Sequence, residues 1–173
     1  MEEDLINNID VNSIKNILAI DVGTEESGYC LIDFETYKPL DFGKVNNEDL
    51  LNIVKTEDYQ VLVYEEFACY GMPIGASTIT SITWNGRYIQ SALDRNQRIV
   101  VARVYRKDEK MNLCHSMKAK DSNIRQALID RFGEVGTKKN KGFFYGFKKD
   151  IWSAYAVGIT WIDKLIDQRL ISF

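Results

Sequence analysis

The chain has 173 residues and a formal net charge of −3, with 45% hydrophobic and 27% charged residues. This composition is typical of one globular domain and excludes a disordered or collagen-like chain. The longest apolar runs span only a few residues, whereas a membrane helix needs about 20, and the acidic N-terminus does not resemble an export signal, so we expect a cytoplasmic protein without a membrane partner.

The first part of the chain predicts mainly strands. Two apolar runs, 17–20 and 27–32, flank a tight glycine-containing turn, and 33–42 suits a further turn and a third strand. A short amphipathic helix is expected over 46–56, and a buried strand over 61–64. These elements predict an antiparallel beginning that leads into a helix and a strand.

The rest of the chain alternates helix and strand. We expect a helix over 77–94, a strand over 99–104 and a helix over 121–132, which begins in good N-cap chemistry. Residues 134–149 read as a basic, aromatic loop, in which the phenylalanines serve as ordinary anchors, and 150–169 as a final helix. This order predicts an α/β protein whose mixed sheet is covered by helices.

Charge is distributed unevenly along the chain. Residues 1–102 carry 7 basic and 17 acidic side chains, whereas 103–149 carry 13 basic and 5 acidic ones. Such asymmetry is typical of proteins that bind a polyanion, although the same lysines and arginines would also suit solvated helix faces. Charge alone leaves both interpretations open.

Carboxylates are the side chains best placed for chemistry, because His115 is the single histidine and the three cysteines form no CxxC pair. Asp21 and Glu65 each end a buried apolar strand, and ligands collect at the carboxyl ends of strands. An unpaired charge there is costly, and metal coordination would offset that cost. The alternatives are a turn cap for Asp21 and a lysine partner for Glu65. Asp150 begins the last helix, where capping is a sufficient explanation.

Several segments, taken in order, resemble the RuvC-type Holliday junction resolvases. Those that resemble the family's active-site segments are 17–29 (ILAIDVGTEESGY), 63–65 (VYE) and 150–158 (DIWSAYAVG). Residues 70–87 and 113–128 look like the phage-encoded branch of that family, which would place the protein in a host cytoplasm. A DxGT turn also opens actin-like kinases, but their two-domain fold needs roughly twice this length.

The resemblance implies an RNase H-like fold with a five-stranded mixed sheet flanked by helices, formed by residues 17–173 after an N-terminal extension, 1–16. Its first and fourth strands would be adjacent, so that Asp21 and Glu65 lie side by side and the last helix brings Asp150 over both. The three carboxylates would bind two Mg²⁺ ions ~4 Å apart, with Mn²⁺ as a substitute. These ions would activate the attacking water and stabilise the leaving oxygen of a phosphodiester.

One position departs from the pattern of the cellular resolvases, which carry a second acid one turn into the last helix. This chain has Ser153 there. Three explanations stay open: three carboxylates suffice, Ser153 holds a metal-bound water, or Glu66 contributes. Successive strand residues point to opposite sides, so we expect Glu66 to face away from Glu65.

The resemblance also implies DNA contacts. Lys110 and Lys120 lie near positions where the family keeps lysines close to the scissile phosphate, so their predicted role is electrostatic catalysis. Phe67 and Tyr70 would stack on bases at the open junction centre, or else pack as core residues. The other predicted phosphate contacts form a collective surface: Lys118, Lys138, Lys139, Lys141, Lys148 and Lys149.

The leading hypothesis is a magnesium-dependent endonuclease that resolves four-way DNA junctions by paired symmetric nicks. The two-fold symmetry of a junction calls for two active sites, and therefore for a homodimer. One alternative within the fold is a YqgF-like RNA nuclease, against which the glycine-rich segment 70–75 counts. The other is a non-catalytic junction-binding protein, for which Ser153 is the hint.

Overall fold

The structure is a computed structural model that describes residues 10–68 and 71–171. Its centre is a five-stranded mixed sheet with the strand order β3-β2-β1-β4-β5, so the expected sheet is confirmed. The predicted DNA contact Tyr70 lies outside the described residues. The strands are β1 (Asn16–Asp21), β2 (Glu26–Asp33), β3 (Pro39–Asn46), β4 (Val61–Glu66) and β5 (Val100–Tyr105).

The strand pairing confirms the expected adjacency of the first and fourth strands. β1 pairs antiparallel with β2, which pairs antiparallel with β3, whereas β1–β4 and β4–β5 are parallel. The carboxyl ends of β1, β4 and β5 therefore meet at one edge of the sheet. Within the described residues, no helix is both long enough and apolar enough to cross a lipid bilayer.

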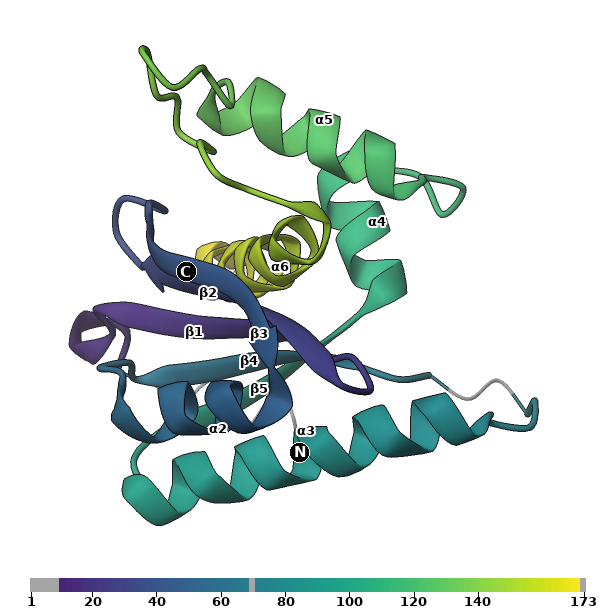
Figure 1. Cartoon of the computed structure of the whole chain (residues 1–173). Coiled ribbons are helices and arrows are strands. Elements are labelled where there is room, and N and C mark those ends of the chain that lie inside the picture. Colours follow the sequence, from purple (N-terminus) through teal and green to yellow (C-terminus); the bar gives the residue numbers. More distant parts are fainter. Residues whose placement is uncertain (1–9, 69–70, 172–173) are drawn as a thin grey trace.

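Helices cover both faces of the sheet (Figure 1). α2 and α3 lie on one face, and α6 lies on the other, with α4 and α5 beyond it. A short 3₁₀ helix, η1, precedes β1. The bounds are η1 (Val11–Ser13), α2 (Asn47–Thr56), α3 (Ala76–Arg95), α4 (Arg106–Cys114), α5 (Asp121–Phe132) and α6 (Lys149–Ile171).

The period-2 alternation of the strands builds two cores. Ile17 and Ala19 of β1 face α6, whereas Leu18 and Ile20 face α2 and α3. α6 carries the longest buried stretch, 154–162, which packs over β1 and β2. Both faces of β1 are therefore buried, which explains its continuous apolar run.

The aromatic loop before α6 packs into the α6-side core. Phe144 and Phe147 are buried, and their rings lie 4.6 and 5.1 Å from the Trp152 ring, centroid to centroid. Ile14, in the predicted N-terminal extension, is also buried in this core. The phenylalanines are thus anchors that tie the loop down along α6.

α4 is the one α-helix among the described residues that the sequence pattern did not predict. Its single buried side chain is Glu109. Because that side chain is a carboxylate, the helix shows no apolar stripe of period 3.6, which is the signal from which a helix is predicted.

Candidate active site

Asp21 and Glu65 end two neighbouring parallel strands. The register pairs Ile20 with Tyr64, so the next residues, Asp21 and Glu65, lie side by side at the carboxyl edge of the sheet. Each lies two positions after a residue of the α6-side core, Ala19 or Val63, so both face the α6 side of the sheet, and both are half-buried. The structure therefore brings together the two carboxylates that were predicted to meet.

The turn after Asp21 is held by a buried hydrogen-bond network. The Gly23 N–H donates to Ser27 Oγ (3.1 Å), whose hydroxyl donates to Asn47 Oδ1 (2.6 Å). Asn47 Nδ2 in turn donates to the Gly23 carbonyl oxygen (3.1 Å). A Cβ on Gly23 would lie 2.2 Å from the Glu26 carbonyl oxygen, so the turn requires glycine. This network fixes the backbone next to Asp21.

A second glycine lets the start of α6 approach the sheet. Gly28 of β2 lies opposite Asp21, and a Cβ on Gly28 would lie 2.4 Å from the Asp150 carbonyl oxygen. Because glycine has no Cβ, the first turn of α6 packs directly against β2. Asp150 is thereby close enough to Asp21 to raise its pKa, but it does not act on Glu65, over which it was also predicted to lie.

The two strand-end carboxyls have raised pKa values. Burial, followed by repulsion from Asp150, raises the pKa of Asp21 to about 6, against the opposing effects of Arg106 and Ser153. Burial, followed by repulsion from Asp21, raises the pKa of Glu65 to about 7. A cation bound between them would lower both pKa values by relieving the repulsion.

Ser153 and Glu66 have different surroundings. The Ser153 hydroxyl is close enough to the Asp21 carboxyl to lower its pKa by hydrogen bonding, so Ser153 is part of the site. Glu66 faces the other side of the sheet, where it accepts a hydrogen bond from the Tyr64 hydroxyl (3.3 Å) and pairs with Arg103 (3.7 Å). The structure thus places Glu66 away from Asp21, as the alternation of strand residues predicted.

Two basic residues that sequence reasoning missed contact the acidic groups. Lys44 Nζ lies 2.9 Å from Asp150 Oδ2 and 3.2 Å from Glu26 Oε2. Arg106 donates to Glu109 Oε2 at 2.6 Å and also contacts Asp121 Oδ1. Lys44 pairs with Gly28 across the β2–β3 ladder. A correct prediction of this strand register would therefore have placed Lys44 beside the start of α6.

Glu109 is a fully buried carboxylate beside this site. Its Oε2 accepts from Arg106, whereas its Oε1 has no hydrogen-bond partner among the described residues. Burial and the neighbouring charge of Glu65 raise the pKa of Glu109 to about 8, although Arg106 opposes the shift. Arg106 is thus the cation around which the carboxylates of α4, α5 and β4 gather.

The predicted DNA contacts are spread over the molecule. Lys110 is half-buried on α4, next to Glu109, and Lys120 is exposed at the start of α5, next to Asp121. Phe67 is half-buried and directly follows β4 at the carboxyl edge. Lys118 is exposed between α4 and α5.

The basic loop separates its lysines. Lys148 and Lys149 line a cavity next to Ser153. Residues 138–141 lie in the part of the loop that follows α5, and that part extends toward the opposite end of the sheet (Figure 1). The five loop lysines of the predicted collective surface therefore form two separate groups, and Lys118 belongs to neither.

The carboxylate side chains at the carboxyl edge are of the type that binds magnesium. Asp21 and Glu65 offer carboxylate oxygens from adjacent strand ends, and Mg²⁺ prefers such ligands. In the described part of the chain, no three acidic, histidine or cysteine side chains are gathered closely enough to hold a metal ion. Asp150 contacts Lys44 instead, and joining Asp21 at an ion would require it to exchange that contact.

Comparison with solved structures identifies the fold. Thermus thermophilus RuvC superposes with a TM-score of 0.63 at 14% identity, over 84% of this chain and 92% of that one. The chain has an α/β RNase H-like fold. T. thermophilus RuvC in complex with Holliday junction substrate gives a TM-score of 0.62 at 12% identity, over 84% and 92%. The yeast mitochondrial Holliday junction resolvase Ydc2 gives 0.60 at 12% identity, over 98% and 87%. No protein-family model and no curated protein sequence matches the chain.

Proposed function

We propose that the protein is a magnesium-dependent endonuclease that resolves four-way DNA junctions by paired nicks. The observation that carries this proposal is the meeting of Asp21 and Glu65 at adjacent strand ends, with Asp150 brought close through Gly28. The fold supports it, because similar solved structures include RuvC, in one case in complex with Holliday junction substrate, and the mitochondrial Holliday junction resolvase Ydc2.

In this mechanism Asp21, Glu65 and Asp150 would hold two Mg²⁺ ions, for which Mn²⁺ would substitute. When bound, Mg²⁺ activates water for attack on the phosphodiester and stabilises the leaving oxygen. The Ser153 hydroxyl orients the Asp21 carboxylate. Lys44 holds Asp150 at the start of α6 before the ions bind.

Basic residues around the site would bind the DNA backbone. Arg106 lies close enough to Asp21 and Glu65 to lower both pKa values, so its charge also acts on a phosphate that lies over them. Lys110 and Lys120 are proposed to add positive charge near the scissile phosphate. Phe67 is placed at the carboxyl edge, where it would meet bases at the junction centre.

A homodimer is proposed to supply the two active sites that paired nicks require. The residues before and along the first half of α3 expose a row of large apolar side chains, which suits burial against a second copy. They are Met72 (75% exposed), Ile74, Ile79 and Ile82. Sedimentation of the purified protein is expected to give a dimer, and Ile79→Glu is expected to give a monomer.

The experiment is a nicking assay on a strand-labelled four-way junction, with and without Mg²⁺. The wild type is expected to cut two opposed strands at symmetric positions, and Asp21→Asn is expected to bind the junction without cutting it. Equal cutting by both proteins would overturn the metal–carboxylate mechanism. Binding by the wild type without cutting would favour the non-catalytic alternative, and preference for an RNA–DNA hybrid would favour the RNA nuclease.

A further inference from the structure

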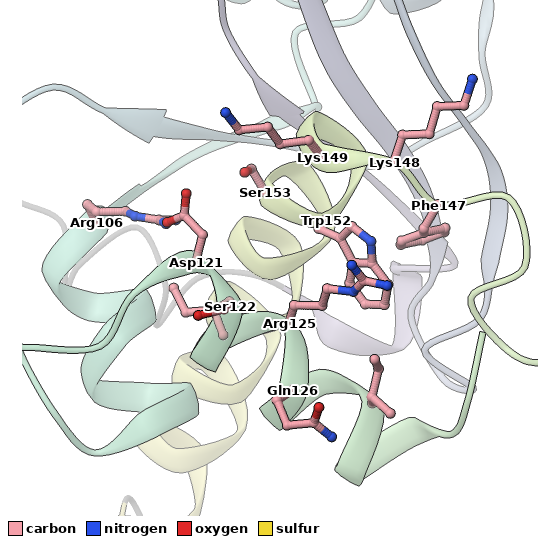
Figure 2. A pocket seen from close by; sticks show the side chains of 12 residues that line it. Arg106, Asp121, Ser122, Arg125, Gln126, Phe147, Lys148, Lys149, Trp152 and Ser153 are labelled. Atoms are coloured by element: carbon pink, nitrogen blue, oxygen red, sulfur yellow. The ribbon is translucent and has the colours of Figure 1, made fainter.

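A cavity of about 500 Å³ lies between α5 and the start of α6 (Figure 2). Its wall includes Ser153, which lowers the pKa of Asp21, and Arg106, which lowers the pKa values of Asp21 and Glu65. The cavity therefore borders directly on the candidate active site. Its volume lies within the ~300–1,000 Å³ that is typical of small-ligand pockets.

The lining of the cavity is basic. Arg106, Arg125, Lys148 and Lys149 contribute four positive charges, whereas Asp121 contributes one negative charge and is paired with Arg106. In Figure 2 Arg106 and Asp121 meet at one side, Lys149 projects from the rim above Ser153, and Lys148 projects from the rim on the side of Phe147. This excess of positive charge favours an anionic ligand.

The lining also provides a stacking platform. The Arg125 guanidinium carbon lies 5.0 Å from the centroid of the Trp152 ring, and Trp152 packs against Phe147. Trp152 is only 6% exposed, whereas Arg125 is an exposed residue, so the guanidinium forms the accessible end of an aromatic stack (Figure 2). Planar guanidinium groups and aromatic rings are the surfaces on which proteins stack unpaired bases.

We infer that this cavity binds one unstacked nucleotide of the substrate DNA strand, next to the phosphodiester that is cut. Its base would lie against Arg125 over Trp152, and its phosphate would lie between Arg106 and the rim lysines. This inference rests on the proposed function and names how the site selects its substrate. A base is released most easily at a branch point, where stacking is already interrupted, so the cavity would favour branched DNA over continuous duplex.

The test measures junction binding in Ca²⁺, which prevents cutting, with a single abasic nucleotide placed in turn at each position around the branch. Wild type is compared with Arg125→Ala, and Arg98→Ala is the matched control. Arg98 is exposed and precedes β5, at the end of the sheet opposite the carboxylates. Trp152→Phe is a second variant that keeps a ring in the core but reduces the stacking surface.

One abasic position is expected to weaken wild-type binding by roughly 10-fold, in line with the energy of base stacking on a protein surface. Arg125→Ala is expected to weaken binding of the intact junction similarly, and to be insensitive to that abasic position. Such non-additivity is the signature of two groups in contact. Trp152→Phe is expected to give a smaller loss at the same position.

Additive effects of Arg125→Ala and the abasic position would overturn the inference, as would an Arg125→Ala protein that behaves like Arg98→Ala. Failure of the proposed function would give a different experimental result. In that case the wild type would not prefer junctions to duplex DNA, or would not cut them in Mg²⁺. A wild type that binds and cuts junctions but shows no coupled abasic position would refute the cavity assignment alone.

Discussion

The basic loop carries two groups of lysines of similar charge that lie at opposite ends of the sheet. Lys148 and Lys149 line the cavity beside Ser153, whereas residues 138–141 lie in the part of the loop toward the other end of the sheet. Phe143, which follows this part, stacks on Phe132, and Phe132 packs against Tyr37 in the β2–β3 turn, beside the start of β1. The fold, and not the density of charge along the chain, therefore decides which lysines can reach a phosphate over Asp21.

The largest expected difference between the two ends of the sheet concerns carboxylates. Asp21→Asn is expected to reduce single-turnover nicking by roughly 10³-fold, because several kcal/mol of metal-based stabilisation of the transition state is lost. Asp94→Asn, an exposed aspartate near the end of α3 at the opposite end, is the matched control and is expected to cut normally. Comparable loss in both variants would contradict the assignment of the carboxyl edge as the active site.

Ion pairs at the two ends are expected to differ in their effect on folding. Arg106→Met leaves the fully buried Glu109 carboxyl group without its hydrogen-bond partner and is expected to lower the free energy of unfolding by about 2 kcal/mol. Arg131→Met, at the other end, removes a more exposed partner of Asp163 and is expected to cost less. Urea denaturation measures both.

The double variant Arg106→Met/Glu109→Met is the control for this prediction, because it removes both charges of the buried pair. We expect it to recover much of the stability that Arg106→Met loses. If the double variant unfolded as readily as the single one, the loss would come from packing of the arginine side chain and not from an unpaired buried carboxylate.

The two lysine groups can be compared directly. The variants Lys148→Ala/Lys149→Ala and Lys138→Ala/Lys139→Ala/Lys141→Ala are both expected to weaken DNA binding and to flatten its salt dependence, by about 0.9 in slope for each phosphate that is no longer neutralised. Only the first variant is expected to slow nicking at saturating DNA, because its lysines border the cavity next to Ser153. Equal slowing by both would contradict the separation of the groups.

A pH dependence of stability is also expected from Glu109. Burial and the charges of Glu65 and Asp21 raise its pKa to about 8, against the effect of Arg106. Because the pKa in the folded state exceeds that in the unfolded chain, the protonated form stabilises the protein at low pH, and that stability is lost as the pH rises through about 8. Relative to Glu109→Gln, the wild type should therefore lose stability between about pH 4.5 and 8, as thermal unfolding in EDTA would show.

Much of the sheet could be predicted from the local pattern of apolar residues. The apolar runs that become β1 and β4 predicted buried strands, and a polar residue at the end of such a run is conspicuous, so Asp21 and Glu65 were found directly. The bounds expected for α2, α3, β5 and α5 agree with the structure to within a residue, because each has an apolar pattern or a capping signal. The β1–β4 adjacency came from the resemblance to RuvC-type resolvases and is confirmed.

What the sequence by itself determined is thus the set of elements with apolar periodicity and the carboxylates at their ends. Only the tertiary structure decided that Lys44 contacts Asp150, that Arg106 joins Glu109 to Asp121, and that the basic loop divides its lysines. The physical reason is that these contacts join residues from different elements, several of them on elements without an apolar pattern. The sequence shows which side chains are charged, but the packing of α4, α5 and α6 decides which ion pairs they form.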